Sequence, residues 1–276
     1  MRRLGSTVLV LLLGFAGAAN GAEPSSADPV AAIDRAIAGN RLIQAGAMLD
    51  RKDLALPAQE RARLVASFLL ARRHDAQALK LFEAALAAQP QDCRLQAGAG
   101  IAALRLGRDK DAEPKLRAST AACPDNAETW GALAVVEDKG GRWDLSAAAY
   151  ARAIALSKDD PALLNNAGVS LMSQRRYAEA IRLFRQALLI DPANEHARNN
   201  LDIARVASGE RPDFNAEEDS GRRAERLNNA GYTALLAGDA AAATNYFDEA
   251  IKVNPFRFDV AETNLKGASE DARAAP

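Results

Sequence analysis

Few residues in this chain have the types and spacing that chemistry requires, and the two cysteines come first. Cys93 and Cys123 are the only cysteines among the 276 residues. In an oxidising compartment such a pair can form a disulfide, whereas in a reducing compartment both stay free or buried thiols. The chemistry of this pair therefore depends on the compartment and on whether the fold brings the two residues together.

Cofactor and metal chemistry find little support in the sequence. The stretch Gly98-x-Gly100-x-x-Ala103 has the spacing of a dinucleotide-binding fingerprint, but that motif needs a β-strand before it, and Cys93 to Ala97 is not a β-branched run. The two histidines, His74 and His196, lie far apart, and no cluster of further ligands accompanies either. No Gly-x-Ser-x-Gly, His-Glu-x-x-His or phosphate-loop motif occurs. The sequence predicts no cofactor, no metal and no enzymatic activity.

Composition favours closely packed helices and disfavours a nucleic-acid partner. Hydrophobic residues make up 49% of the chain, but aromatic residues only 5%, and much of the remainder is alanine. Alanine loses no side-chain entropy in a helix and lets helices approach closely. The 35 lysines and arginines are balanced by 36 aspartates and glutamates. A nucleic-acid-binding surface requires a basic excess that this chain lacks.

The N-terminus has the three-part layout of a secretory signal peptide. Two arginines follow Met1, an apolar run extends over residues 7–19, and small residues lead to Gly21 and Ala22. The apolar run is shorter than the roughly 20 residues that span a bilayer. We therefore expect a signal peptide over residues 1–22, cleaved near Gly21 or Ala22, and a periplasmic protein without a membrane span. The alternative is an inner-membrane anchor formed by an uncleaved N-terminus.

A repeated pattern organises the rest of the chain. Alanine, phenylalanine, alanine and proline recur at one spacing in three places: Ala78-Phe82-Ala85-Pro90, Ala180-Phe184-Ala187-Pro192 and Ala243-Phe247-Ala250-Pro255. The first two copies are three periods of 34 residues apart, and weaker copies lie between them. A period of 34 is typical of a helix–turn–helix repeat. In these features the sequence resembles the tetratricopeptide repeat (TPR) family.

This resemblance implies an all-α, right-handed α-solenoid of about five helix–turn–helix units with a C-terminal capping helix. We divide the chain into a degenerate N-terminal helical unit (23–58), four units (59–194), an extra helix and acidic loop (195–223), a last unit (224–257), and a capping helix with a disordered tail (258–276). The tail is expected to begin at Ser269. Gly168 and Gly231 fall where the two helices of one unit cross. Pro114 falls inside a second helix, which we expect to bend or to begin late.

The repeat frame gives the two cysteines a defined relation. Cys93 and Cys123 occupy the first and thirty-first positions of one unit. In a helical hairpin the start of the first helix lies near the end of the second, so we predict a disulfide between them. Closing that loop would stabilise the fold by about 3–4 kcal/mol on the chain-entropy model. The alternative is two buried or free thiols.

The first helices of successive TPR units line a concave groove that binds partner proteins. Carried over by resemblance, the partner-binding residues are Asn165, Asn166, Val169, Met172, Asn228, Asn229, Tyr232 and Leu236. Asn-Asn-Ala-Gly occurs at both 165–168 and 228–231, and Asn199-Asn200 has the same register, which suggests a row of amides. An asparagine can donate to a peptide carbonyl and accept from a peptide N–H at the same time. The alternative is that these asparagines only cap or solvate helices.

The resemblance implies a non-catalytic scaffold that holds an extended peptide or a helix of a partner protein in the cell envelope. Asn254-Pro255-Phe256-Arg257-Phe258, followed by Asn264-Leu265, is similar to the tight-adherence pilus assembly TPR proteins of bacteria. That similarity points to pilus or secretion-system assembly. Two alternatives stay open: a periplasmic adaptor that regulates a peptidoglycan synthase or hydrolase, and an enzyme. The oligomeric state is also left open.

Overall fold

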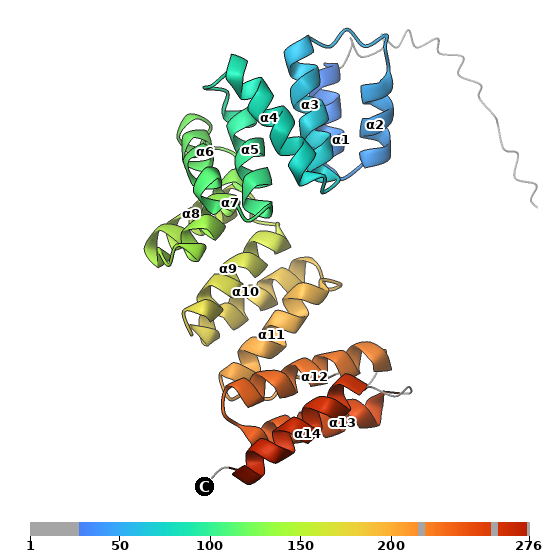
Figure 1. The fold of residues 1–276 in the computed structure, drawn as a ribbon, viewed down its shortest axis with the longest axis vertical. Coiled ribbons are helices and arrows are strands. Elements are labelled where there is room, and N and C mark those ends of the chain that lie inside the picture. The colour runs from blue at the N-terminus through green and yellow to red at the C-terminus, as the bar shows by residue number, and fades with distance from the viewer. Residues whose placement is uncertain (1–27, 215–218, 255–258, 275–276) are drawn as a thin grey trace, which may run out of the picture.

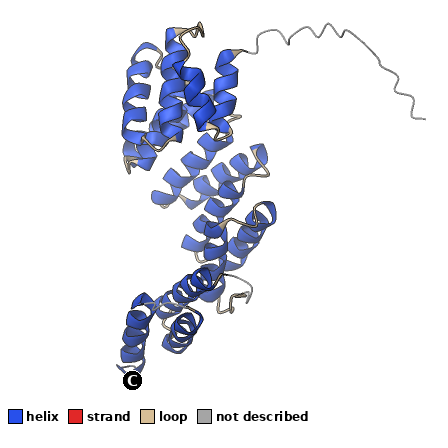
Figure 2. Cartoon of the chain, turned by 90° about the vertical axis from the view of Figure 1, so that its right-hand side faces the viewer, coloured by secondary structure: helices blue, strands red, loops and turns tan. Residues whose placement is uncertain are grey.

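The protein folds as an elongated stack of helices. The computed structural model describes residues 28–214, 219–254 and 259–274, and within these ranges it contains fourteen helices and no strand (Figures 1 and 2). The predicted signal peptide lies outside the described residues, as do Pro255 to Phe258 of the pilus-like segment. No helix in the described ranges combines the length and the hydropathy needed to cross a bilayer.

The helices follow one another in pairs from α1 to α10. They are α1 (Pro29–Ala38), α2 (Leu42–Asp50), α3 (Ala58–Ala71), α4 (Asp75–Ala88), α5 (Cys93–Arg105), α6 (Asp109–Ala122), α7 (Ala127–Lys139), α8 (Trp143–Leu156), α9 (Pro161–Ser173) and α10 (Tyr177–Ile190). After them come a single helix, α11 (Glu195–Ala207), a further pair, α12 (Ser220–Leu236) and α13 (Ala240–Val253), and α14 (Asp259–Ala274). Each helix contacts the next along the chain. The predicted all-α solenoid is confirmed.

Local sequence sets the start and end of each unit. The first helices α5, α7, α9 and α11 each begin after an Asp or Asn whose side chain accepts from a backbone N–H in the first turn. These caps are Asp92, Asn126, Asp160 and Asn194, and each stands 34 residues after the cap before it. The turns contain a residue with positive φ at the same interval, among them Gly107 and Gly141, and glycine adopts that conformation without steric cost.

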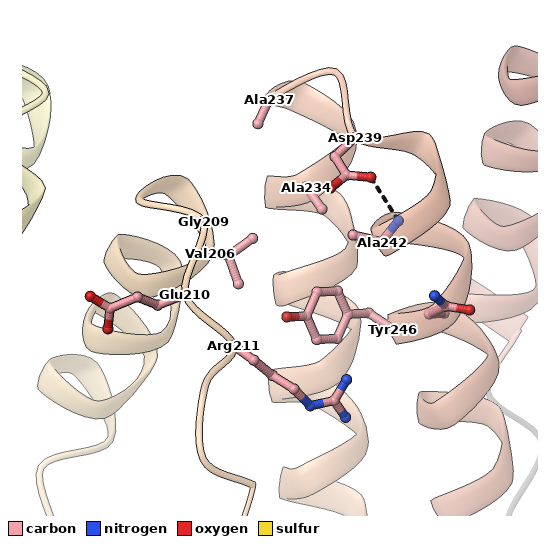
Figure 3. A pocket seen from close by; sticks show the side chains of 10 residues that line it. Val206, Gly209, Glu210, Arg211, Ala234, Ala237, Asp239, Ala242 and Tyr246 are labelled. Carbon is pink, nitrogen blue, oxygen red and sulfur yellow. Dashed lines mark hydrogen bonds between the residues drawn. The ribbon is translucent and has the colours of Figure 1, made fainter.

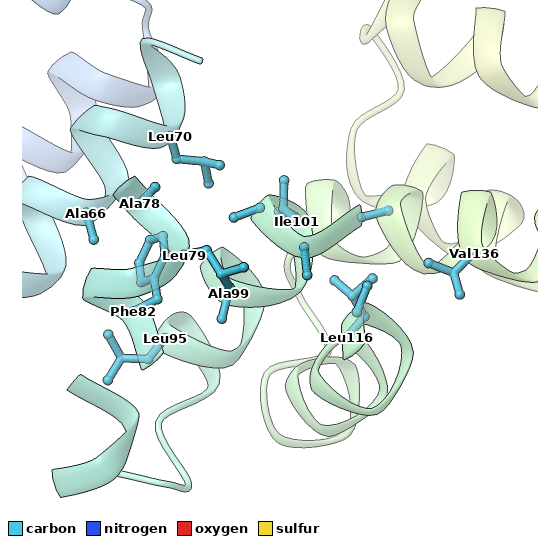
Figure 4. Close-up of a cluster of buried hydrophobic side chains, with 14 of the residues drawn as sticks. Ala66, Leu70, Ala78, Leu79, Phe82, Leu95, Ala99, Ile101, Leu116 and Val136 are labelled. Atoms are coloured by element: carbon cyan, nitrogen blue, oxygen red, sulfur yellow. The ribbon is translucent and has the colours of Figure 1, made fainter. Parts of the chain in front are cut away.

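Close helix crossings make the core. A Cβ on Gly168 of α9 would lie 2.5 Å from the Phe184 ring of α10, and a Cβ on Gly231 of α12 would lie 2.6 Å from the ring of Phe247. The two glycines therefore allow the crossings that the sequence predicted. Figure 4 shows the equivalent packing nearer the N-terminus, where Phe82 and Leu116 fill the space between helices.

Ion pairs join successive units in the N-terminal half. Buried Arg63 of α3 donates to both carboxylate oxygens of Asp34, at 2.9 and 2.7 Å, and to Glu60 at 2.8 Å. Arg94 of α5 donates to the other Glu60 oxygen at 2.7 Å. Burial alone would raise the pKa of Glu60, but the hydrogen bonds from Arg63 and Arg94 outweigh it and hold that pKa below the usual value.

Two local expectations are corrected by the structure. The helix that contains Pro114 was expected to bend or to begin late. The late start is wrong, because α6 begins 34 residues after α4 and has the same length, whereas the bend stays a prediction. Pro114 removes one N–H, and the bonds on either side continue the helix. The tail was expected to be disordered from Ser269, whereas α14 continues to Ala274. The added residues include helix formers such as Ala, Glu and Arg, with no glycine or proline.

Candidate partner-binding groove

The single helix α11 has the place of a first helix, and the described residues before α12 contain no second helix to pair with it. It begins after the cap Asn194 and ends in a turn at Gly209, whose φ is 84°, so it keeps the repeat frame to that point. One period after Ala180 and Phe184 of α10 stand Phe214 and Glu218. A second helix here would place the Phe214 ring at the Ala180 position, where close helix packing requires alanine. It would also place the Glu218 carboxylate at the Phe184 position, where the core requires an aromatic ring. The frame therefore ends, and α12 packs directly on α11.

This arrangement brings α9, α11 and α12, each the first helix of its unit, side by side around a groove of about 580 Å³. Its lining residues are Val169, Met172 and Ser173 of α9, Arg175 and Tyr177 after it, Ile203 and Ala207 of α11, Thr233 and Leu236 of α12, and Ala237. We call this the α9–α12 groove. Val169 is 39% exposed and Leu236 72%, although both are apolar. Arg175 is the one charged residue among the lining residues.

Three asparagine rungs connect α9, α11, α12 and α14. In each rung an amide N–H of one helix donates to the amide oxygen of an asparagine in an earlier helix of this set. The rungs are Asn200 to Asn165 at 2.9 Å, Asn229 to Asn199 at 2.8 Å, and Asn264 to Asn228 at 2.9 Å. They join α9 to α11, α11 to α12, and α12 to α14, so the amide row extends along the array.

The rungs leave hydrogen-bonding capacity free. In the described part of the chain, the amide oxygens of Asn200, Asn229 and Asn264 accept no hydrogen bond, and the amide groups of Asn199 and Asn228 donate none. Exposed Asn166 accepts one long bond of 3.4 Å from Asn165. The row can therefore offer both acceptors and donors to a further chain.

The predicted site residues divide into three sets. Val169, Met172 and Leu236 line the groove. The four predicted asparagines belong to the rungs or lie beside one, and their side chains bond to other asparagines rather than capping helices. Tyr232 is 52% exposed on α12 but does not line the groove.

Sequence reasoning missed Ile203, Ala207, Thr233 and Asn264. The repeat period could have found the first two, because Ile203 and Ala207 stand 34 residues after Val169 and Ser173. Asn264 follows Asn228 by 36 residues, outside that period.

Other chemistry is limited in the described residues. Cys93 and Cys123 are joined by a disulfide, with their Cα atoms 6.0 Å apart, which ties the start of α5 to the end of α6. Within the described ranges, no group of three or more His, Cys, Asp or Glu side chains is placed to hold a metal ion.

Comparison with known proteins agrees with this fold. Family models described as tetratricopeptide repeat match residues 68–127, 132–195 and 224–257, which together exceed half of the chain. No curated protein matches the sequence. Among solved structures, a chain of the APC/C hetero-tetramer Cut9-Hcn1 matches with a TM-score of 0.59 and 18% identity over 89% of this chain. The match takes in only 50% of that longer chain.

A second structure, a tetratricopeptide repeat protein from Parabacteroides merdae, matches with a TM-score of 0.51 and 12% identity over 87% of this chain and 97% of its own. At these identities the likeness concerns the fold alone. The repeat matches, the 34-residue spacing of caps and turns, and the paired helices together show that the chain belongs to the tetratricopeptide repeat family.

Proposed function

We propose that this protein is a scaffold that holds an extended, uncharged and apolar segment of a partner protein in the α9–α12 groove. The observation that supports it best is the pairing of exposed apolar side chains, Val169 and Leu236, with a neighbouring row of amides that have free donors and acceptors. Apolar side chains of a partner would enter the groove, and its backbone would bond to the amides.

The chemistry of the lining sets the class of segment. Desolvating a charged side chain is costly unless it meets an opposite charge, and the groove offers only Arg175. A segment rich in charged residues would therefore bind poorly. The family consists largely of interaction scaffolds, and in this member the α9–α12 groove would be the binding face and an uncharged, apolar peptide its ligand.

We further propose that the scaffold works in the cell envelope after export. Supporting this are the signal-peptide layout of residues 1–22 and the Cys93–Cys123 disulfide, because structural disulfides persist in oxidising compartments. The pilus-like segment near the C-terminus makes assembly of a pilus or secretion system the process we propose.

The test is site-specific photo-crosslinking in cells, with the probe at Ser173, an exposed residue of the groove lining. We expect the captured peptides to be apolar and poor in charged residues, and capture to be lost in Leu236→Asp. Leu189→Asp is the matched control, since Leu189 is 82% exposed on α10 and lines none of the cavities described.

Two results would count against the proposal. Capture that survives Leu236→Asp as well as Leu189→Asp would remove the groove as the binding site. Captured peptides dense in lysine, arginine, aspartate or glutamate would contradict the chemistry. Asn166→Ala then tests the amides separately, and we expect it to weaken capture without abolishing it.

A further inference from the structure

Four arginines surround the junction of α11, α12 and the chain between them, and two of them hold a carboxylate. Arg226 of α12 donates to both oxygens of buried Asp202 at 2.6 and 3.1 Å. Arg211, in the connecting chain, donates to both oxygens of Glu249 at 2.8 Å. Figure 3 shows Arg211 beside the ring of Tyr246, and its guanidinium carbon lies 5.5 Å from the ring centre.

The other two arginines, Arg205 of α11 and Arg223 of α12, make no hydrogen bond to a carboxylate in the described part of the chain. The Nε atom of each is buried and has no hydrogen-bond acceptor. The side chain of Arg205 is only 20% exposed, and the nearest carboxylate, that of Glu210, is 4.0 Å from its Nε. Arg223 forms no ion pair within the described part of the chain. Buried charged donors are costly to leave unpaired, so such groups in native proteins are expected to bind protein, water or a ligand.

Both arginines line one cavity. It measures about 410 Å³, and its lining residues are Arg205, Arg211, Pro212, Asp213, Phe214, Arg223 and Glu249. We call it the basic cavity. It shares no residue with the α9–α12 groove, so it is a separate site.

The charges of the lining define the ligand. Arg211 and Glu249 neutralise each other through their two hydrogen bonds, so among the lining residues only the carboxylate of Asp213 stands against Arg205 and Arg223. Glu210, outside the lining, lies 4.0 Å from the Arg205 Nε and reduces the positive charge further. A net charge of at most +1 on the lining fits a monoanion rather than a phosphate dianion. Arginine binds a carboxylate with two parallel N–H bonds, as Arg226 already does with Asp202 in this junction.

We propose that the basic cavity binds a carboxylate group from outside the described chain, through Arg205 and Arg223. Two sources share this chemistry: an acidic side chain of a partner protein, and the C-terminal carboxylate of a partner. The Phe214 ring, which lines the same cavity, would pack against the atoms that carry the carboxylate. The site does not depend on the proposed groove, and each can fail without the other.

The test is NMR of the arginine Nε–Hε groups in the full chain, with the Arg205 and Arg223 signals assigned through Arg205→Lys and Arg223→Lys. Sodium acetate is titrated against sodium chloride at constant ionic strength. We expect both signals to shift saturably with acetate and not with chloride. Arg222 is the internal control, because it is exposed and already pairs with Glu195 at 3.3 Å.

The lysine variants keep the charge and lose the paired N–H geometry. We expect acetate to bind Arg205→Lys at least about tenfold more weakly, read from the Arg223 signal, because a hydrogen bond to a charged group is lost. Two short peptides then separate the sources: one carries a glutamate and an amidated end, and the other carries only a free C-terminus. The peptide that binds more tightly shows whether the carboxylate comes from an acidic side chain or from a C-terminus.

Three results would overturn the proposal. No shift with acetate would mean that both Nε groups already have partners. Equal shifts with chloride would mean that the cavity responds to ionic strength only. Tighter binding of inorganic phosphate than of acetate would mean that the ligand class is wrong.

Discussion

Replacing Gly168 by alanine tests the physical account of the helix crossings. An added Cβ would lie 2.5, 2.8 and 2.9 Å from three carbons of the Phe184 ring, all closer than real Cβ contacts. Overpacking of this kind costs about 1–3 kcal/mol. Alanine in a helix interior recovers about 0.5–1 kcal/mol relative to glycine. We therefore expect Gly168→Ala to destabilise the α9–α10 unit by about 1–2 kcal/mol.

The matched control is Gly267→Ala in α14. Gly267 is exposed inside its helix, and a Cβ there would meet nothing within 4 Å. The same chemical change should therefore stabilise α14 by about 0.5–1 kcal/mol, since only the helix propensity changes. The two substitutions differ in sign only because one site is a crossing and the other is open.

Hydrogen exchange with mass spectrometry is the suitable assay, because repeat arrays open unit by unit rather than all at once. Gly168→Ala should speed exchange in α9 and α10 about 5–30-fold. In a Phe184→Leu background the ring carbons are gone, and the cost of the alanine should fall towards zero. Exchange in α9 and α10 that is unchanged or slower in Gly168→Ala would refute the reasoning.

Three further predictions concern bonds between and within units. Cys93→Ser with Cys123→Ser should lower the stability of the α5–α6 unit by about 3–4 kcal/mol, measured by hydrogen exchange, because the disulfide closes a separation of 30 residues. Glu137→Gln should cost about 1–3 kcal/mol in urea unfolding, since the buried carboxylate accepts from Arg117 and Arg142, which would keep only Glu113 as a charged partner. The pKa of Glu60 is lowered from 4.5 by its arginine partners, so its stabilisation is complete above that value and is lost as the pH falls through the lowered pKa. Wild type and Glu60→Gln should therefore converge in stability at low pH; a constant difference from pH 6 to 3 would contradict this.

Features that follow the 34-residue period could be predicted from the sequence. Gly168 and Gly231 were placed at helix crossings because the repeat fixes which residues of one unit face each other. The row of paired asparagines was visible for the same reason. Its bonding was not, because the rungs join asparagines 35, 30 and 36 residues apart, and none of these separations equals the repeat period.

Features outside the period could not be predicted in this way. The side chains of the basic cavity come from α11, α12, α13 and the chain that replaces a missing helix. Only packing brings Arg205, Arg223 and Glu249 together, since no spacing in the sequence relates them. The extent of α14 was not predicted for another reason. Position near the chain end favours disorder, whereas the helix propensity of Ser269 to Ala274 favours continuation of the helix.

Both proposed sites have one physical origin, the half unit at α11. In the complete units a second helix lies between successive first helices and fills the space behind them. Between α11 and α12 the described residues contain no such helix, and in the sequence Phe214 and Glu218 stand where alanine and phenylalanine are needed. On one side, α12 meets α11 directly and the α9–α12 groove stays open to an uncharged segment. On the other side, Pro212 and Phe214 of the connecting chain line the basic cavity, where the buried Nε groups of two arginines are left without an acceptor. A loss of one helix from a regular array can therefore create two surfaces of opposite chemistry, an apolar one for a peptide and a cationic one for a carboxylate.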